Sequence, residues 1–309
     1  MIAFLFPGQG SQAVGMGKAL AEQFPECRQV FDEADAALGE SLSDLIFNGP
    51  ADTLTLTENT QPAILTASIA AYRLLEARGL TPAMVAGHSL GEYSAHVAAG
   101  TMSFADAVRI VRHRGRYMQD AVPVGSGAMA AILGLDAATV EQACREAAEG
   151  DVISAANLNA PGQVVIAGST AAVTRAIERA KALGAKRAIP LQVSAPFHCA
   201  LMKPAEVRLA PELRALTVSD PRVPVVANID ALPKTTGAAA IEALIQQVSG
   251  PVRWEDVMRR LMADGATTFV EVGPGSVLSG LGRKLSKESR YVNIDAPDHL
   301  AAVQAVFAQ

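Results

Sequence analysis

The sequence predicts an α/β fold in which a parallel sheet is accompanied by a smaller inserted unit. Short apolar runs alternate with stretches of helical period in the first and last parts of the chain, an order typical of a buried parallel sheet. Between them, about 65 residues follow the order β-α-β-β-α-β, the ferredoxin-like or split βαβ pattern, and have the size of a small domain. At 309 residues, half of them apolar, the chain is long enough for one large domain with such an insert.

The first part of the chain opens with a strand and continues with helices. The apolar run at 2–6 is ended by Pro7, which predicts a short buried strand. The segment NTQP at 59–62 has the polar cap, at Asn59 or Thr60, and the proline of a helix start. A short strand at 84–86 leads directly into a helix. Helices are expected at 17–24, 25–38, 59–78, 89–98 and 104–119.

The inserted pattern begins near Gly125. After it, the alternation of strands and helices of the first part of the chain resumes. We expect inserted strands at 128–133, 152–156, 164–167 and 186–189, and inserted helices at 137–148 and 170–183. After the insert we expect helices near 201–216, 238–248, 254–262, 276–284 and from 297, and strands at 268–272 and 291–294. The predicted large domain therefore comprises residues 1–124 and 193–309, and the small domain comprises residues 125–192.

Charge and cysteine content exclude several classes of function. The 26 basic and 31 acidic residues give a net charge of -5, which does not favour a nucleic-acid partner. Cys27, Cys144 and Cys199 include no CxxC pair, which argues against a zinc or redox motif and fits a reducing cytoplasm. The N-terminal apolar run is too short for a signal peptide, and no run approaches the ~18 residues of a membrane span. Neither nucleic acid nor membrane is expected as a partner.

A serine stands between two glycines where the strand at 84–86 meets the next helix. The segment GHSLG at 87–91 fits G-x-S-x-G, the nucleophile elbow, in which a sharp turn holds the serine hydroxyl clear of the backbone. The following helix N-terminus favours negative charge at this place. The alternative is structural, because Ser89 and Glu92 also form the S-x-x-E pattern of a capping box. The preceding strand and the following helix favour the nucleophile.

A nucleophilic serine needs a base, and His198 is the best candidate among the five histidines. It lies with Pro196 in a turn just after the insert, and loops at strand ends commonly carry catalytic bases. The alternative for His198 is a hydrogen-bonded loop histidine. We expect His88 to be structural and His96 to lie in the core. His113 is expected at the surface or at the edge of a cleft, and His299 is expected to be solvated.

Several segments match one family in order and over almost the full chain. They are FPGQGSQ at 6–12, NTQPA at 59–63, GHSLGEYSA at 87–95, RG at 114–115, PGQVVIAG at 161–168, PFHCALM at 196–202 and EVGPG at 271–275. Together they resemble the malonyl-CoA:acyl carrier protein transacylases. The resemblance implies an α/β-hydrolase-like large domain with a ferredoxin-like insert. It also implies a ping-pong reaction in which malonyl passes from malonyl-CoA, through a serine ester, to the phosphopantetheine thiol of acyl carrier protein, for fatty acid or polyketide synthesis and without a cofactor.

The resemblance also assigns roles to residues. Ser89 attacks the thioester, and His198 takes and returns its proton. The backbone N–H groups of Gln9 and Leu90 form the oxyanion hole, and the elbow pattern predicts Leu90 independently. The backbone carbonyl of Gln247 orients His198. Without the resemblance, FPGQG is a glycine turn after a strand, and Ala13 at the third glycine position of the Rossmann pattern argues against dinucleotide binding.

Arg114 is expected to select the substrate. A guanidinium can hold the free carboxylate of a malonyl group with two charge-assisted hydrogen bonds. The alternative is that Arg114 belongs to a solvated helix face with Arg109, Arg112 and Arg116. Phe197 resembles an aromatic residue of malonyl-selective members that narrows the pocket against a methyl branch, and its alternative is core packing.

Three further expectations concern partners and alternatives. Cys199 is expected to be a spectator, although a thiol next to the base could make the protein sensitive to alkylation. The acidic carrier protein could contact short basic runs, namely Lys181, Lys186, Arg187, Arg283, Lys284 and Lys287, or these could be ordinary surface charges. Competing functions are a serine esterase or thioesterase with the same elbow, and a non-catalytic carrier-binding subunit.

Overall fold

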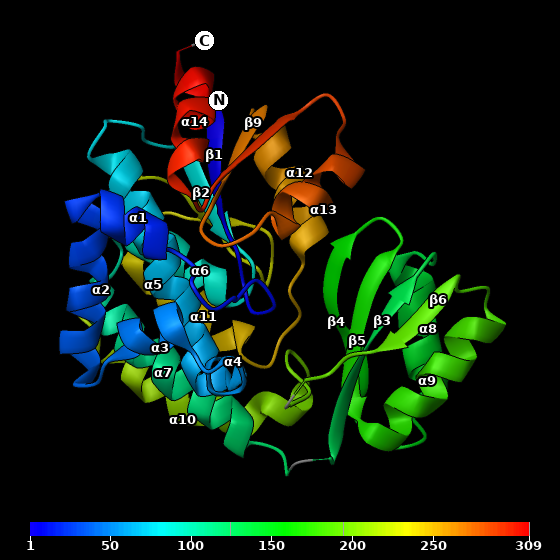
Figure 1. Ribbon diagram of the computed structural model, residues 1–309. Helices are drawn as coiled ribbons and strands as arrows, with labels where there is room; N and C mark the ends of the chain where they lie inside the picture. Colours follow the sequence, from blue (N-terminus) through cyan, green and yellow to red (C-terminus); the bar gives the residue numbers. More distant parts are fainter. Residues whose placement is uncertain (124, 194, 309) are drawn as a thin grey trace.

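Two sheets organise the computed structural model, which describes residues 1–123, 125–193 and 195–308 (Figure 1). One sheet has the strand order β10-β9-β1-β2-β7-β8, and the other has the order β4-β5-β3-β6. A large α/β unit and a smaller antiparallel unit therefore lie side by side, as the fold class predicted. Residues 124, 194 and 309 lie outside the described residues. Positions 124 and 309 are the last residues of the two segments of the predicted large domain.

The larger sheet is parallel up to its last strand and is buried at its centre. Strand β1 (Ile2–Phe6) lies between β9 (Thr268–Val272) and β2 (Met84–Gly87). Residues 3–6 are completely buried, because helices cover both faces of such a sheet. The flanking strands are β10 (Arg290–Ile294), β7 (Val225–Val226) and the antiparallel edge strand β8 (Pro233–Lys234).

The register of this sheet positions the site. Phe6 at the end of β1 pairs with Gly87 at the end of β2. The loop after β1, which carries Gln9, and the turn after β2, which carries Ser89, therefore leave the same sheet edge side by side. Ligand sites of open parallel sheets lie at this carboxyl edge.

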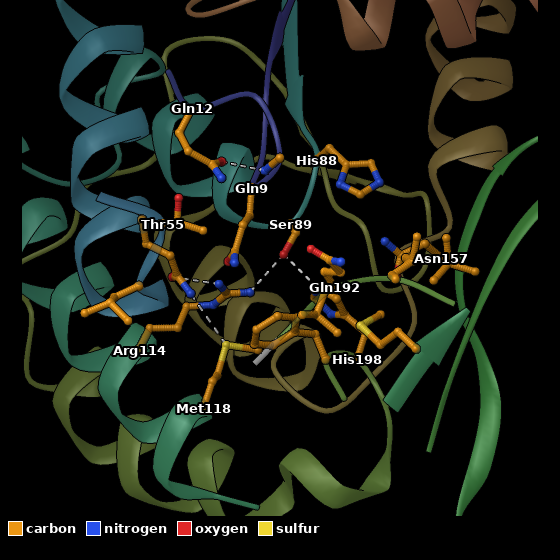
Figure 2. A pocket seen from close by; sticks show the side chains of 18 of the residues that line it. Gln9, Gln12, Thr55, His88, Ser89, Arg114, Met118, Asn157, Gln192 and His198 are labelled. Carbon is orange, nitrogen blue, oxygen red and sulfur yellow. Dashed lines mark hydrogen bonds between the residues drawn. The ribbon is translucent and has the colours of Figure 1, made fainter. Parts of the chain in front are cut away.

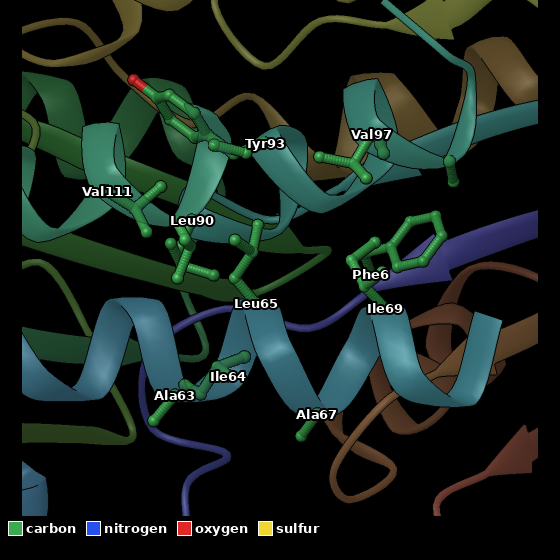
Figure 3. Close-up of a cluster of buried hydrophobic side chains, with 14 of the residues drawn as sticks. Phe6, Ala63, Ile64, Leu65, Ala67, Ile69, Leu90, Tyr93, Val97 and Val111 are labelled. Atoms are coloured by element: carbon green, nitrogen blue, oxygen red, sulfur yellow. The ribbon is translucent and has the colours of Figure 1, made fainter. Parts of the chain in front are cut away.

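The helix α5 (Thr57–Glu76) forms the centre of the main core. Figure 3 shows Leu65 and Ile69 of α5 on the side that faces Phe6 of β1 and side chains of the neighbouring helices, including Leu90 and Val111. The remaining helices of this unit are α1 (Lys18–Gln23), α2 (Pro25–Leu38), α3 (Leu42–Asn48), α4 (Ala51–Thr55), α6 (Leu90–Ala98), α7 (Phe104–Asp120), η1 (Ala200–Met202), α10 (Lys203–Arg214), α11 (Gly237–Gln247), α12 (Trp254–Ala263), α13 (Val277–Leu285), η2 (Pro297–His299) and α14 (Leu300–Phe307). Within the described ranges, none of the helices is both long enough and apolar enough to cross a membrane.

The cap predicted for α5, at Asn59 or Thr60, lies three or four residues after the actual cap position, Leu56. The helix begins at Thr57, and Pro62 lies inside it. The side chains of Asn59 and Thr60 do not cap α5, since they donate back to the carbonyl oxygens of Thr53 and Leu54. These bonds connect the end of α4 to α5. The sequence pattern of a helix cap does not indicate such contacts with another helix.

The smaller sheet is antiparallel and has its own core. Its helices pack on one face over apolar side chains such as Ile132, Val140 and Ile166. The opposite face turns toward the large unit, and Leu158 and Val252 join the two units by a backbone hydrogen bond of 2.9 Å. Its elements are β3 (Gly127–Leu133), α8 (Ala137–Ala147), β4 (Ile153–Ala160), β5 (Gln163–Ser169), α9 (Thr170–Ala182) and β6 (Arg187–Pro190).

Candidate active site

A cavity of about 450 Å³ lies where the carboxyl edge of the large sheet faces the small sheet. Its lining includes Gln9, Ser89, Arg114 and His198 from the large unit, and Met129 is among the residues that the small sheet contributes. Figure 2 shows the Ser89 hydroxyl between the Arg114 guanidinium and the His198 ring. The structure therefore brings together side chains that the sequence separates by up to 189 positions (Gln9 to His198).

The turn at Ser89 has the geometry of a nucleophile elbow. Ser89 has φ of 51°, a region that non-glycine residues rarely occupy outside functional sites. A Cβ atom at Gly87 would lie 1.9 Å from the carbonyl oxygen of Gly91, and one at Gly91 would lie 2.0 Å from that of Phe6. Both positions therefore need glycine, which explains the G-x-S-x-G spacing.

Asn228, just beyond β7, holds this turn in place. Its Oδ1 accepts a hydrogen bond of 2.7 Å from the Ser89 N–H, and its Nδ2 donates one of 2.7 Å to the Gly87 carbonyl. The capping-box alternative for Ser89 is wrong, because among the described residues its hydroxyl makes no capping bond. The carboxylate of Glu92 instead accepts bonds from the Asn228 N–H and the Gln247 amide.

His198 is placed to take a proton from Ser89. Its Nε2 lies 2.6 Å from Ser89 Oγ, and its Nδ1 lies 3.0 Å and 3.2 Å from the carbonyl oxygens of Gln247 and Gly250. Because carbonyl oxygens only accept hydrogen bonds, we assign the ring proton to Nδ1, which leaves the Nε2 lone pair for the serine O–H. His198 also has positive φ, 60°, so the backbone is held in an uncommon conformation at both residues.

The His198 ring is neutral at physiological pH. Burial and, to a smaller extent, the nearby Arg114 charge lower its pKa to about 3, against the opposing effect of the carbonyl contacts. A neutral imidazole can accept the serine proton directly. The base is therefore ready in the free protein.

Arg114, on α7, brings a completely buried guanidinium to the same hydroxyl. Its Nη2 donates to Ser89 Oγ at 3.1 Å and to Gln247 Oε1 at 2.9 Å, and its Nη1 donates to Gln61 Oε1 at 2.8 Å. Burial lowers its pKa, and the nearby Tyr93 and Glu92 raise it. The hydrogen-bond partners that the described residues give this guanidinium are uncharged. The arrangement leaves a buried positive charge beside the nucleophile that a substrate carboxylate could neutralise.

The other arginines of α7 do not form one solvated face. Arg109 and Arg116 are half-exposed and pair with Asp106 and Glu58. Arg112 is buried and bonds Asn59 and Glu40. The solvated-face expectation therefore describes Arg109 and Arg116, while Arg112 and Arg114 point inward.

The side chain of Gln247 has a role that sequence reasoning missed. The resemblance implied only its backbone carbonyl, whereas its Nε2 donates to the Ser89 carbonyl at 2.8 Å and to Glu92 Oε2 at 2.9 Å. Gln61 and Asn228 were missed as well. Gln61 lies in the matched segment NTQPA, but no signal in the sequence points to Asn228, which is 139 positions from Ser89.

The remaining histidines lie apart from the proton-transfer pair. His88 lines the cavity, but its Nε2 contacts Asn159 Oδ1 at 2.8 Å and burial lowers its pKa. His96 is a core residue, as expected, and its pKa falls to about 3 through burial. His113 pairs with Glu212 outside the cavity, and His299 pairs with Asp295.

The structure supports the expectation that Cys199 is a spectator and not a reactive thiol. The thiol is 1% exposed and donates to the carbonyl oxygen of Pro196 at 3.1 Å. Burial raises its pKa to about 11, so the reactive thiolate form is scarce at neutral pH. Cys199 therefore does not present a reactive thiol to reagents beside the base. Phe197 packs in the main core and also borders the cavity, so a role in narrowing the pocket against a methyl branch stays a prediction.

The basic residues proposed for carrier contact are not all brought together. Lys186 and Lys284 line one hollow of about 840 Å³ between the two units. Lys181 lies on α9 and pairs with Glu178. Over the residues that the structure describes, no three His, Cys, Asp or Glu side chains are grouped so that they could hold a metal ion.

Comparisons with known proteins agree with this site. Residues 3–298 match the model of the acyl transferase domain family. The chain is 53% identical to the malonyl CoA-acyl carrier protein transacylase of Bacillus subtilis, over 96% of this chain and 94% of that protein. The corresponding Escherichia coli K12 protein is also 53% identical, over 97% of both chains.

Solved structures give the same result. An acyl carrier protein S-malonyltransferase from Vibrio cholerae superposes with a TM-score of 0.96 at 48% identity, over 98% of this chain and 99% of that chain. A malonyl-transacylase in complex with a type II polyketide synthase acyl carrier protein superposes with a TM-score of 0.96 at 44% identity, over 99% of both chains.

Proposed function

The chain belongs to the malonyl-CoA:acyl carrier protein transacylase family, and we propose that it transfers malonyl from coenzyme A to the carrier thiol through an ester on Ser89. The observation that carries this mechanism is the convergence of two groups on one hydroxyl. His198 Nε2 lies 2.6 Å from Ser89 Oγ, and Arg114 Nη2 lies 3.1 Å from it. A base and a carboxylate-binding cation are thereby placed on either side of the attacking oxygen.

The first half-reaction loads the serine. The Ser89 proton passes to His198 Nε2 while Oγ attacks the thioester carbonyl carbon, giving a tetrahedral oxyanion. The intermediate collapses by breaking the C–S bond, and the coenzyme A thiolate leaves with the proton from Nε2. The products are malonyl-Ser89 and free coenzyme A.

The second half-reaction reverses these roles. His198 Nε2 takes the proton of the phosphopantetheine thiol, whose sulfur attacks the ester carbonyl. Collapse breaks the bond to Oγ, and Ser89 recovers its proton from Nε2. Every group involved belongs to the chain, to malonyl-CoA or to the phosphopantetheine thiol, so we propose that no cofactor takes part.

Two backbone N–H groups, those of Gln9 and Leu90, are proposed to hold the oxyanion. Neighbouring N–H groups have other partners: Gly91 and Glu92 donate to the His88 and Ser89 carbonyls, and Ser89 donates to Asn228. Leu90 opens α6, where N–H groups lack partners within the helix.

The loop after β1 supports the second donor in the same way. Gly10 donates to Gln12 and Ser11 donates to Gly8, and the Gln9 N–H has no partner among the residues that the structure describes, so it is free for the substrate. A Cβ atom at Gly8 would lie 2.4 Å from the His88 carbonyl oxygen, so glycine lets this loop approach the elbow. One such donor is worth about 3–4 kcal/mol in the transition state.

The pH dependence of loading tests the neutral base. An exposed histidine base with pKa near 6.5 would lose about tenfold in rate between pH 7.5 and 5.5. The pKa of His198 lies near 3, so we expect the loading rate of Ser89 to stay nearly flat over that range. Burial raises the pKa of Glu92 to about 7, but this carboxyl keeps an acceptor oxygen in both protonation states.

Rapid quench with malonyl-CoA, followed by mass spectrometry of the intact protein, measures this rate. Because the folded pKa of His198 lies below its unfolded value, its contribution to stability is present above about pH 6.5 and is lost as pH falls toward 3. Circular dichroism at each pH therefore confirms that the protein stays folded. A tenfold loss of rate by pH 5.5 in folded protein would contradict the neutral buried base.

The proposed function is tested by following the fate of the acyl group. Protein mixed with malonyl-CoA and phosphopantetheinylated acyl carrier protein should yield malonyl-carrier protein, with little free malonate. Release of malonate as the main product would favour the serine hydrolase. Absence of any acyl-Ser89 would favour a non-catalytic carrier-binding subunit.

We propose the cytoplasm as the site of action and fatty acid synthesis as the pathway. Three unpaired, buried thiols are compatible with a reducing compartment. A relative solved with a polyketide carrier protein makes polyketide synthesis the alternative pathway. Transfer rates to carrier proteins of the two types would separate these pathways.

A further inference from the structure

A carboxyl group that the proposed reaction does not use lies directly behind the active site. Glu92 is in the first turn of α6 and is completely buried. Its Oε2 accepts from the Asn228 N–H at 3.0 Å and from Gln247 Nε2 at 2.9 Å. Its Oε1 finds no hydrogen-bond partner in the described chain. Burying a carboxyl group with so few donors is costly, so stabilising the fold is a poor explanation for Glu92.

Glu92 is one of three partners that fix which way the Gln247 amide points. The amide nitrogen of Gln247 faces the Ser89 carbonyl and Glu92 Oε2. The Ser89 carbonyl can only accept a hydrogen bond, and Glu92 Oε2 acts as an acceptor here too, so both bonds require the NH₂ group of Gln247. The oxygen end must then face Arg114 Nη2, at 2.9 Å. A guanidinium only donates, so the opposite amide orientation would place the Gln247 NH₂ group next to Arg114 Nη2, two donors with no acceptor between them.

The amide in turn holds the guanidinium of Arg114. Gln247 Oε1 fixes one terminal nitrogen, and Gln61 Oε1 fixes the other at 2.8 Å. Arg114 Nε has no hydrogen-bond partner among the described residues, so the hydrogen bonds that orient the guanidinium are those to the two amides and the Ser89 hydroxyl. The ring of Tyr93 packs beside it, with its centroid 5.4 Å from the guanidinium carbon. Bidentate binding of a carboxylate depends on the plane of the guanidinium.

We infer that Glu92 is a positioning residue for substrate selection, because its Oε2 is one of the two acceptors that hold the Gln247 amide in the orientation that presents Arg114 to a substrate carboxylate. The inference rests on the proposed function, in which Arg114 binds the malonyl carboxylate. The backbone carbonyl of Gln247 that faces His198 belongs to the end of α11 and does not depend on the amide. Loss of Glu92 should therefore affect malonyl more than an acyl group without a carboxylate.

The test compares loading of Ser89 from malonyl-CoA and from acetyl-CoA in two variants. Glu92→Leu removes both acceptor bonds, and we expect the malonyl-to-acetyl ratio of kcat/KM to fall on the order of 10- to 100-fold. Glu92→Gln keeps an oxygen that can accept from Asn228 and Gln247, so this variant should retain most of the ratio. A purely structural role would lower both rates together and leave the ratio unchanged.

Glu271→Leu is the matched control. Glu271 is another completely buried glutamate, on β9, and its carboxylate accepts from the N–H groups of Leu278 and Ser279 in α13. Its replacement should lower the melting temperature and leave the malonyl-to-acetyl ratio as in the wild type. The control therefore separates loss of a buried carboxylate from loss of the contact to Gln247.

Gln247→Met serves if Glu92→Leu does not fold. This variant removes the amide, keeps the backbone carbonyl and should lower the same ratio. The inference is overturned if the wild type prefers malonyl and the folded variants, Glu92→Leu or Gln247→Met, keep that preference. A wild type that loads acetyl as well as malonyl would instead contradict the proposed function, and the inference with it.

Discussion

Replacing His198 by alanine is expected to slow malonyl loading of Ser89 by about 10²- to 10⁴-fold, the usual worth of a positioned general base. The physical reason is that Ser89 Oγ loses the acceptor at 2.6 Å, while the guanidinium of Arg114 still donates to it. Rapid-quench mass spectrometry of the intact protein measures the loading rate.

His113→Ala is the matched control for this prediction. His113 lies on α7, pairs with Glu212 and is half-exposed, outside the cavity. Its replacement should leave the loading rate unchanged. Thermal unfolding at pH 7.5 shows whether His198→Ala is folded. A folded His198→Ala protein that loads within tenfold of the wild-type rate would show that His198 is not the base.

Replacing Arg114 by alanine should change which acyl group is loaded. Loss of a buried, hydrogen-bonded charge pair costs about 2–5 kcal/mol, so malonyl loading should fall by roughly 30- to several-thousand-fold. An acetyl group has no carboxylate that Arg114 could bind, so its loading loses no such contact. The Ser89 hydroxyl also no longer accepts the 3.1 Å hydrogen bond from Arg114 Nη2. Acetyl loading should therefore be kept or rise. The kcat/KM values for both thioesters measure the change.

Two further variants of α7 sharpen this prediction. Arg114→Lys keeps the charge but loses the planar fork that bonds Gln61 and Gln247, so it should recover only part of the malonyl rate. Arg116→Ala removes a half-exposed arginine that pairs with Glu58, and it should leave both rates unchanged. Equal losses for malonyl and acetyl in Arg114→Ala would disprove the carboxylate role.

Much of the fold could be predicted because its long elements have clear periods. The strand at 2–6 and the helix Pro25–Leu38 were predicted with the bounds that the structure gives. Strands β7 and β8 have two residues each, too few for any period, and they are defined by pairing with each other and with β2. The helices α3 and α4 are also short and were missed, because packing against α5 rather than intrinsic propensity stabilises such pieces.

The site could be predicted in part for a related reason. Residues that act through a local pattern, such as Ser89 in its elbow, are visible in one segment of the sequence. The hydrogen-bond network behind them joins α6, α7 and α11 with the loop after β7, and its contacts span up to 158 positions. Asn228 and the side chain of Gln247 have no local pattern, because their partners come together only in the folded chain.

The central claim is that malonyl is carried on the Ser89 hydroxyl, and peptide mapping after acid quench tests it most directly. Protein exposed briefly to malonyl-CoA should carry one malonyl group on the peptide that contains Ser89. Later addition of phosphopantetheinylated carrier protein should remove this group, and Ser89→Ala should never acquire it. Malonyl found on another residue, or full transfer activity in Ser89→Ala, would contradict the account.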